Sequence, residues 1–574
     1  RGVQKVSHAP VAPHSAMRCV LPLVAAVASE WYDGIDGIRV FGPSDNPGPE
    51  LLDLYNKMHD AQFSSERHAI LLKSGTYSNL EIAVGYYTSI YGVGATDKDV
   101  KLSSFYTLDG KVGGATQNFW RSVEGVTVSN PSITWACSQA CPVRRSTIEG
   151  EFWLSEPGPP HWSSGGHVSD LTVKGKVHVG TQQQYFFRNS EFERGVDYTT
   201  GGVNFVFVGV EGAPSSSTTD KKYLVSNAKS TPIVAEKPYL VEENGTWSIA
   251  VPHAQTDLVG RAPAATRRIA MEDVFVAKVG DTAANITEGI RGKKALLFTP
   301  GTYGLSEVLT IDQTDFVVLG IGFPTLVPTG TNSALLITAE GAHVAGLLLE
   351  AGSPKDAGET RPLLRWSGPK GSLSDIFARV GAFSYETDFK ASCLVPRADV
   401  HVQIDGSEVT VDNTWFWHAD HDDCNGTSDS AFSGHGFMVT GSDVRVYGLK
   451  VEHTMKDLVK WEGERGEVYL FQSELPYHDS GFTGVGYHVV PEVKQHTAMG
   501  VGVYIVGALT VDTGVRVPPT ASMTHVFAWC ITGPETQFGS VMCMSEGSDQ
   551  CYKGDQCLGN ICYVGHVGET SVVV

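Results

Sequence analysis

The chain has 574 residues, more than one hydrophobic core of ordinary size accommodates, so we expect at least two domains. Its formal net charge of −20 argues against nucleic acid or an anionic membrane as a partner, and disfavours polyanionic substrates such as pectin or alginate. With 41% hydrophobic residues, 18% charged residues and 63 glycines, the composition indicates a soluble, turn-rich protein built mainly from β-strands.

The N-terminal segment has the pattern of a secretory signal peptide that starts at Met17. Arg18 is followed by a short apolar run and then by residues 26–28, Ala-Val-Ala, a small-x-small cleavage pattern. We therefore expect residues 1–28 to be an upstream extension and signal peptide, and the mature protein to be secreted and extracellular. The apolar run is too short to span a bilayer, and no later stretch has a transmembrane pattern, so we expect no membrane partner.

Two stretches of the chain repeat one pattern. Residues 69–94 (AILLKSGTYSNLEIAVGYYTSIYGVG) and residues 295–322 (ALLFTPGTYGLSEVLTIDQTDFVVLGIG) each contain an apolar run, Gly-Thr-Tyr, an alternating strand pattern and Gly-x-Gly. The match indicates an internal duplication. We therefore expect an N-terminal domain over residues 29–260 and a C-terminal domain over residues 261–528.

Between these landmarks the chain consists of short β-like runs separated by Gly, Asn, Asp and Ser, and long amphipathic helical patterns are scarce. A β-sandwich would also give short strands. A parallel β-helix accounts better for the duplication and the spacing, because each coil leaves little room for helices and small polar residues occupy its tight corners. The expected fold class is all-β, with two parallel β-helices in tandem.

The tail, residues 529–574, is rich in cysteine. Four of the ten cysteines of the chain, Cys543, Cys551, Cys557 and Cys562, lie close together in it. In a secreted chain the default interpretation is disulfide bonding, so we expect a disulfide-bonded cap. A zinc site is the alternative, and the lack of paired Cys-x-x-Cys motifs argues against it.

The clearest candidate for chemistry is the stretch from Val444 to Tyr477. Two β-like runs in it end in carboxylates, Glu452 and Glu474, which are 22 residues apart. Solenoid coils are roughly 20–45 residues long and their strands stack about 4.8 Å apart. Both carboxylates could therefore share one cleft, as acid–base chemistry on a glycosidic bond requires. The alternative is a pair of solvated surface glutamates, which the neighbouring Trp, Pro-Tyr and His residues disfavour.

A series of motifs occurs along the chain in a characteristic order: NFWRSVEG (118–125), TWACSQACPVRR (134–145), QQYFFRNSEF (183–192), TPIVAEKPYL (231–240), LLFTPGTY (296–303), DNTWFWHADH (412–421), YGLKVEH (447–453) and LFQSELPY (470–477). With these motifs in this order, the chain resembles glycoside hydrolase family 55, the β-1,3-glucanases or laminarinases, over nearly all of residues 31–515. The resemblance implies two tandem right-handed parallel β-helices of the pectin-lyase type, and cleavage of β-1,3-glucan with inversion at the anomeric carbon.

By position, the resemblance implies that Glu474 is the general acid and that Glu452 is the acidic residue on the side of the attacking water. Gln184 corresponds to a glutamine that holds this water. Two positions depart from the family pattern. Val208 stands where the family has a water-holding serine, which implies a differently held water or weak activity. His418 stands where the family usually has arginine, so it keeps a donor but loses the fixed charge and the bidentate fork.

Other side chains near the two glutamates are candidates for sugar binding. Aromatic rings that could stack on a pyranose, or equally belong to the core, are Trp415, Trp417, Trp461 and Tyr504. Candidates for hydrogen bonds to sugar hydroxyls or to the glutamates are Asp420, His421, His453, Gln472 and Tyr477. The HADHDD run (418–423) also resembles a metal site, but such runs more often form turns and hydrogen-bond networks, so we expect no metal.

These observations predict a secreted, inverting glycoside hydrolase that is exo-acting on laminarin-like β-1,3-glucan. It would need no metal or organic cofactor, because its chemistry is proton transfer. We expect a monomer whose partner is the glucan polysaccharide or oligosaccharide. One alternative is a non-catalytic glucan-binding or adhesion protein, which the changes at Val208 and His418 would favour. The other is a polysaccharide lyase or epimerase on the same fold, which needs a base beside a neutralised carboxylate.

Overall fold

The structure is a computed structural model of the chain. It describes residues 1–4, 30–108, 114–157, 162–199, 202–217, 223–329, 333–352, 362–424, 431–477, 481–534, 537–544, 550–554, 556–558 and 561–568. Residues 1–34 form one unit and residues 35–574 form a second, compact unit. The predicted signal peptide from Met17 to Ala28 lies outside the described residues. In the described part of the chain, no helix is long and apolar enough to cross a membrane.

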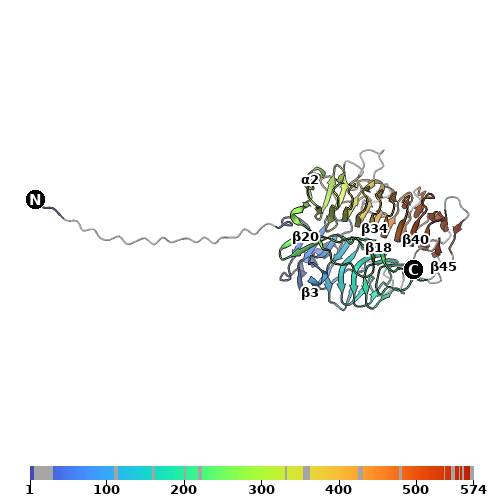
Figure 1. Ribbon diagram of the computed structural model, residues 1–574, viewed down its shortest axis with the longest axis horizontal. Coiled ribbons are helices and arrows are strands. Elements are labelled where there is room, and N and C mark those ends of the chain that lie inside the picture. The colour runs from blue at the N-terminus through green and yellow to red at the C-terminus, as the bar shows by residue number, and fades with distance from the viewer. Residues whose placement is uncertain are drawn as a thin grey trace. The chain divides into compact units, whose positions relative to one another are not determined.

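The first half of the compact unit is a stack of parallel strands (Figure 1). The strands of its main sheet, in spatial order, are β1 (Ile38–Phe41), β2 (His68–Leu72), β4 (Thr88–Gly92), β6 (Arg121–Glu124), β9 (Val143–Ile148), β11 (Gly166–Val173), β13 (Gln184–Arg188), β16 (Asn204–Val208) and β17 (Leu224–Ala228). Strands β3 (Gly75–Ala83), β5 (Val100–Tyr106), β7 (Thr127–Val128) and β14 (Glu191–Phe192) pair beside this path. Another sheet contains β8 (Ser132–Thr134), β10 (Glu151–Trp153), β12 (Val177–His178) and β15 (Val196–Asp197).

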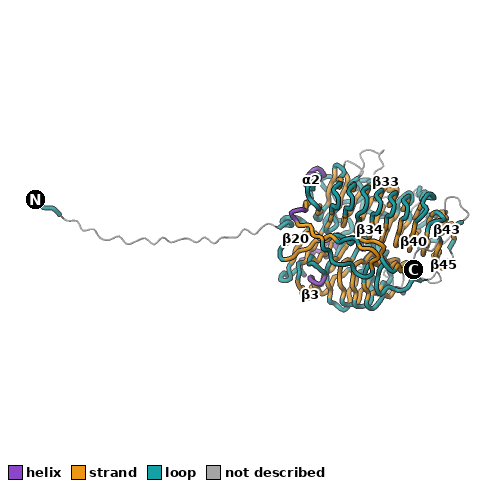
Figure 2. Tube along the Cα trace, in the orientation of Figure 1, coloured by secondary structure: helices purple, strands orange, loops and turns teal. Residues whose placement is uncertain are grey.

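The second half repeats this plan with longer strands. Its main sheet follows the order β23 (Val274–Ala277), β24 (Ala295–Phe298), β27 (Val317–Gly320), β30 (His343–Glu350), β32 (Ser372–Val380), β34 (Thr410–His418), β36 (Arg445–Glu452), β38 (Gly466–Glu474), β40 (His496–Ile505), β42 (Ser522–Cys530), β46 (Ile561–Val567) and β45 (Gln556–Leu558), with β25 (Thr302–Leu305) and β28 (Thr325–Pro328) beside it. A second sheet contains β26 (Leu309–Ile311), β29 (Leu335–Ile337), β31 (Pro362–Trp366), β33 (Arg397–Ile404), β35 (Phe432–Val439), β37 (Val459–Trp461), β39 (Tyr487–Val489), β41 (Val511–Val517), β43 (Phe538–Met544) and β44 (Cys551–Tyr552). The predicted all-β fold with two tandem parallel β-helices is confirmed (Figure 2).

An antiparallel connection joins the two β-helices. Its strands are β18 (Thr231–Val234), β19 (Tyr239–Glu243), β20 (Thr246–Val251), β21 (Gln255–Leu258) and β22 (Arg267–Ala270). The boundary that the sequence predicted, between residues 260 and 261, lies between β21 and β22.

The C-terminal end of the second helix differs in detail from the predicted tail. The predicted boundary between residues 528 and 529 falls inside β42, and β43 continues the stack by one more parallel strand. The stack ends where β44 pairs antiparallel with β43 and β46 pairs antiparallel with β42. These two strands cover the edges of the two sheets. The expected disulfide bonding is confirmed by Cys543–Cys551, and a second bond joins Cys393 to Cys424.

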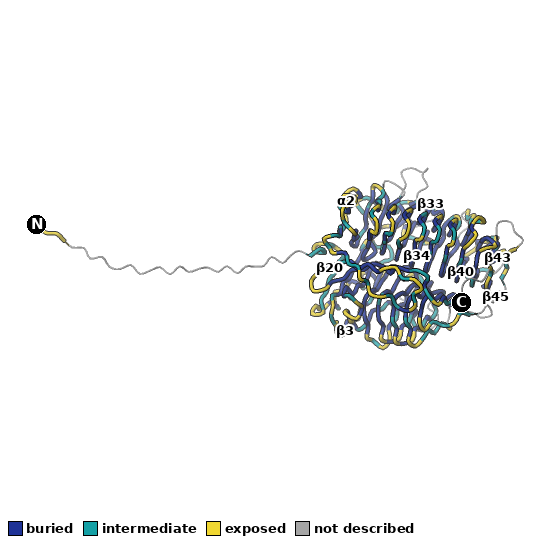
Figure 3. Tube along the Cα trace, viewed as in Figure 1, coloured by how far each residue is buried: buried dark blue, intermediate teal, exposed yellow. Residues whose placement is uncertain are grey.

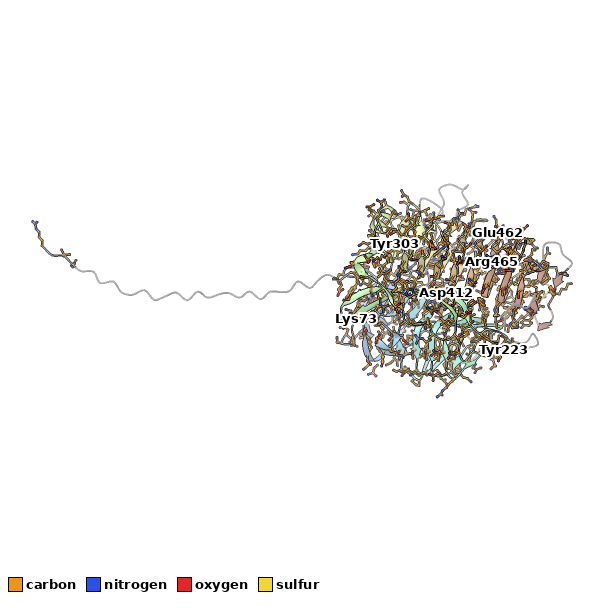
Figure 4. All side chains as sticks on the ribbon, in the orientation of Figure 1. Lys73, Tyr223, Tyr303, Asp412, Glu462 and Arg465 are labelled. Atoms are coloured by element: carbon orange, nitrogen blue, oxygen red, sulfur yellow. A yellow bond between two sulfur atoms is a disulfide. The ribbon has the colours of Figure 1, made fainter. Side chains whose placement is uncertain are left out.

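The duplication extends to hydrogen bonds of single side chains. The Tyr77 hydroxyl donates to the carbonyls of Phe41 and Lys73, at 2.7 and 2.9 Å. The Tyr303 hydroxyl donates to the equivalent carbonyls of Ala277 and Thr299, at 3.0 and 2.9 Å. In both copies a short helix, α1 (Gly48–Met58) or α2 (Ala283–Gly289), follows the first strand. In Figure 4, Lys73 and Tyr303 lie at the same end of the two β-helices.

Apolar side chains stack in rows inside each helix, where the strands are buried (Figure 3). In one row Val411, Val446, Val468 and Ala498 are in register on successive strands and at most 1% exposed. Burial of each valine in this row contributes about 1.5–3 kcal/mol. These rows explain why the strands have near-continuous apolar sequences.

Each long strand of the second helix bends at one residue with a left-handed backbone. These residues occupy one position along the stack: Gly346, Asp375, Asn413, Gly448, Leu470, Gly500 and His525. The bend faces the first helix so closely that a Cβ at Gly448 would lie 3.1 Å from His167 Nδ1, and one at Gly500 only 2.4 Å from Val206 Cγ2. Glycine is needed at these two positions for both conformation and space.

A buried ionic cluster joins the two helices at this bend. Arg144 donates to Asp375 at 2.7 Å and to Asp412 at 2.7 Å, and Arg188 donates to Asp412 at 2.9 Å. Arg188 also pairs with Glu236 of the connection. Figure 4 shows Asp412 in the middle of the unit, where the ribbons of the two halves meet. Burial would raise the pKa of Asp412, but the two guanidinium groups hold it well below its usual range.

We expect Asp412→Asn to lower the free energy of unfolding by about 3–5 kcal/mol, because it leaves two buried guanidinium groups without a full counter-charge. The measurement is urea unfolding at pH 7. The control is Lys174→Met, which removes an exposed ion pair with Glu149 and should cost less than about 1 kcal/mol. Equal losses in the two variants would contradict a stabilising role for the cluster.

Candidate active site

A cavity of about 250 Å³ lies between the two β-helices. The first helix contributes Thr116, Gln117, Phe119, Gln139, Ser164 and Gln183 to its lining. The second helix contributes Trp415, Trp417, Asp420, His421, Glu452, His453, Glu474, Tyr477, Val506 and Ile531. Both glutamates predicted from the sequence therefore reach one cavity.

The coil spacing explains why Glu452 and Glu474 meet. They are the last residues of β36 and β38, and they are directly paired in the parallel register. The same row continues to Trp417 on β34 and Tyr504 on β40. Adjacent strands are about 4.8 Å apart, so neighbouring coils place the two carboxylates side by side, as the 22-residue spacing predicts.

Three N–H donors converge on the Glu452 carboxylate. Gln139 Nε2 and Gln472 Nε2 donate to its Oε1 at 2.7 and 2.8 Å, and Trp415 Nε1 donates to its Oε2 at 2.8 Å. Burial raises the pKa of Glu452 well above its usual value and the charge of Glu474 adds to this, whereas the donors favour the ionised form.

Glu474 has a less polar environment. It accepts a hydrogen bond from the Tyr477 hydroxyl, and His453 Nε2 lies 4.0 Å from its Oε2. Burial raises the pKa of Glu474 to about 7, although the bond from Tyr477 lowers it. The two carboxyls titrate as a coupled pair. The three hydrogen bonds that Glu452 accepts favour its ionised form, whereas Glu474 accepts one.

Asp420 forms a second polar group near Glu474. Asp420 Oδ1 accepts hydrogen bonds from Trp417 Nε1 and His421 Nδ1, each at 3.1 Å, and lies 3.8 Å from His453 Nε2. Burial would raise the pKa of Asp420, but the bond from His421 and the charge of His453 hold it well below its usual range. Burial lowers the pKa of His453 to about 4, so near neutral pH its ring is uncharged. In the described residues, no group of three or more His, Cys, Asp or Glu could hold a metal ion.

The remaining predicted residues are split between the cavity and the core. Trp415 and Trp417 line the cavity, but both are at most 2% exposed and pack on Phe119, so they form its wall rather than an open stacking platform. Gln472 donates a hydrogen bond to Glu452. His418 bonds through Nδ1 to the His453 carbonyl and is buried.

Five predicted residues lie outside the cavity lining, namely Gln184, His418, Gln472, Trp461 and Tyr504. Trp461 belongs to β37, in the other sheet of the second helix, where it is part of the apolar core. Tyr504 is buried, and its hydroxyl donates to Gln184 Oε1. Trp461 is therefore a packing residue of the second helix, whereas Tyr504 packs between the two helices, in an apolar cluster with Val203 and Leu224.

Gln184 and Val208, which the resemblance relates to the attacking water, both lie outside the cavity lining. The amide of Gln184 is occupied at both ends, by Tyr504 and by the Ser164 carbonyl, and is fully buried. Val208 lies in an apolar cluster between the helices, in register with Arg188, and is also outside the cavity lining. The absence of a hydroxyl at Val208 therefore does not affect the cavity. Ser164 and Gln139 provide a hydroxyl and an amide there instead.

The sequence interpretation did not single out the residues that the first helix contributes. Gln139 lies in a turn between β8 and β9, 313 residues before the glutamate that it bonds. The one signal was its place in the motif TWACSQACPVRR. Ser164 and Gln183 likewise lie on loops just before strands of the first helix, at the edge that faces Glu452.

A parallel β-helix with a buried, register-paired couple of carboxyls at one cavity defines a carbohydrate-active enzyme of the acid–base type. A family model described as the LAM55 pectate lyase-like domain matches residues 274–474. An exo-β-1,3-glucanase of Streptomyces sp. (strain SirexAA-E / ActE) is 31% identical over 509 residues, which are 83% of this chain and 81% of that protein. The chain belongs to glycoside hydrolase family 55, the β-1,3-glucanases, and is a glycoside hydrolase.

Solved structures agree with this assignment. The structure of sacteLam55A from Streptomyces sp. SirexAA-E matches with a TM-score of 0.81 and 27% identity, covering 92% of this chain and 98% of that one. A variant of sacteLam55A in complex with glucose also matches with a TM-score of 0.81, at 28% identity, covering 93% of this chain and 98% of that one.

We expect an infrared titration to detect the proton on Glu474. In wild type, a protonated-carboxyl band should disappear with a midpoint near pH 7, because burial raises the pKa of Glu474 to about 7. The band should be absent in Glu474→Gln. The control is Asp420→Asn, which should retain it, because Asp420 is already ionised. A band unchanged by Glu474→Gln would place the proton elsewhere.

Proposed function

We propose that this protein is an inverting, exo-acting hydrolase of β-1,3-glucan, with Glu474 as general acid. The observation that carries the proposal is the register pair Glu452–Glu474 at one cavity, with hydrogen bonds that favour ionisation of the first and burial that favours protonation of the second. The family membership and the exo-β-1,3-glucanase relative support the substrate and the mode of attack.

In this mechanism Glu474 gives its proton to the glycosidic oxygen as the bond to the anomeric carbon breaks. A water attacks the same carbon from the opposite face, and its proton passes to Glu452. Gln139 and Ser164 are positioned to hold this water, because both line the cavity and Gln139 bonds Glu452. The product is a free reducing sugar of inverted configuration. Transfer of the proton back to Glu474 through solvent restores the starting state.

The lining of the cavity favours a neutral sugar. It contains two glutamates, one aspartate and two histidines, and no Arg or Lys among the described residues. A lyase or epimerase acting on uronic acids needs a cation beside the substrate carboxylate. The charge distribution in the cavity therefore supports hydrolysis of a neutral glucan over the lyase alternative.

The proposal includes secretion. It is motivated by the signal-like pattern that starts at Met17 and by the disulfide bonds Cys393–Cys424 and Cys543–Cys551, since such bonds persist in oxidising compartments. Expression of the full chain in a secreting host, followed by N-terminal sequencing of the protein in the medium, tests it. Retention of the protein inside the cells would contradict it.

We expect wild type to release glucose from laminarin, and Glu474→Gln to lose about 10²–10⁴-fold in rate, which is the contribution of a general acid. The measurement is reducing-sugar release, with proton NMR of the first product to show the α-anomer. Binding of laminarin without release of sugar would instead support the binding-protein alternative. A β-anomer as first product would contradict inversion.

We expect Tyr477→Phe to move the basic limb of the kcat/KM profile to higher pH by about one unit. The hydroxyl of Tyr477 stabilises ionised Glu474, so its loss raises the pKa of the acid, which stays protonated to higher pH. The control is Tyr504→Phe, which removes a hydroxyl bonded to Gln184 instead. Equal shifts in both variants would contradict the assignment of this limb to Glu474.

A further inference from the structure

Lys450 is a buried lysine that the mechanism above does not use. Its side chain is only 1% exposed, and its Nζ has no hydrogen-bond partner among the described residues. Burial of an ammonium group without hydrogen bonds is costly, so such a residue in a folded protein needs an explanation.

The register places Lys450 directly next to the support of Glu452. Lys450 is two residues before Glu452 on β36, so both side chains project from the same face of the strand. Its register partners are Trp415 on β34 and Gln472 on β38. These two residues donate hydrogen bonds to Glu452. In the register of the sheet, Lys450 therefore lies between two residues that hold one carboxylate.

The charges around Lys450 come from several elements. Its strongest electrostatic attraction is to Glu452, and weaker interactions reach Cys141 before β9, Asp375 on β32 and Asp412 on β34. His167 on β11 also faces it. Glu452 in turn faces Glu474 and Asp420. Burial lowers the pKa of Lys450 to about 8, so the group is charged throughout the acid range.

We propose that Lys450 is a positioning residue whose ammonium charge keeps Glu452 ionised while Glu474 holds the shared proton. The inference rests on the proposed function, which requires an ionised group on the water side. Burial and the neighbouring Glu474 both oppose that ionisation. A nearby positive charge lowers the pKa of a carboxyl, so the Lys450 ammonium opposes both effects. Among the described residues, Nζ of Lys450 forms no hydrogen bond that would fix it to another group.

The competing explanation is structural. Lys450 also faces the two aspartates of the interhelical cluster, so it could serve only to balance their charge. The two roles differ in what they do to the pH dependence of catalysis. A structural role changes stability and the amount of active enzyme, whereas control of Glu452 moves the acid limb of the kcat/KM profile.

The test is Lys450→Met, which removes the charge and keeps a side chain of similar length. If the methionine variant does not fold, Lys450→Gln, which is polar and uncharged, replaces it. With laminarin as substrate, the acid limb should move to higher pH by about one unit or more, which is a tenfold or larger loss at pH values below the limb. The basic limb, which follows Glu474, should stay in place. Lys450→Arg keeps the charge and should leave the acid limb where wild type has it.

The matched control is Val451→Ala. Its side chain is buried on the opposite face of the same strand, so the change lowers the melting temperature without removing a charge. Both limbs should stay at their wild-type positions. If Lys450→Met and Lys450→Gln lose activity but keep the wild-type acid limb, Lys450 is structural and the inference is overturned.

An infrared titration separates this inference from the proposed function. In Lys450→Met, a protonated-carboxyl band should persist to higher pH than in wild type, and the further change Glu452→Gln should abolish this difference. The measurement needs no turnover, so it decides the inference even if laminarin is not cleaved. Absence of cleavage would contradict the proposed function alone, and an unchanged titration would contradict the inference alone.

Discussion

The docking of the two β-helices through buried charges is the interaction on which the site depends. Arg144 and Arg188 of the first helix bind Asp375 and Asp412 of the second. Asp412 is in β34, a few residues before the tryptophans that line the cavity. A guanidinium group that holds two carboxylates fixes orientation as well as distance. The cluster therefore sets how the loops of the first helix meet the carboxylates of the second.

The same docking produces the electrostatics of the site. The burial that raises the pKa of Glu474 to about 7 results from the first helix covering the strand ends of the second. That covering surface also delivers Gln139, whose amide favours the ionised form of Glu452. On a solvated sheet edge both glutamates would titrate at ordinary values and both would be ionised near neutral pH. The interface thus gives two chemically equal carboxyls different hydrogen-bond environments.

The sequence was sufficient for features that depend on contacts within one helix. The Gly-Thr-Tyr repeat predicted the duplication, because Tyr77 and Tyr303 stabilise turns that are local in the chain. The spacing of Glu452 and Glu474 predicted their pairing, because one coil separates them. It was insufficient for Gln139 and Ser164, since no periodicity relates residues of the first helix to residues some 300 positions away. Those contacts depend on how two finished helices pack.

Gln184 and Val208 lie outside the cavity lining for the same physical reason. Both residues lie on strands whose side chains are buried on either face, one face in the core of the first helix and the other against the second helix. On such strands, whether a residue is polar or apolar does not indicate which of the two buried faces its side chain belongs to. Charged residues inside apolar runs are the better signal. Arg188 in QYFFRNS and Asp412 in TVDNTWFW are tolerated in a strand only where a buried opposite charge meets them, so they mark the interface that creates the cavity.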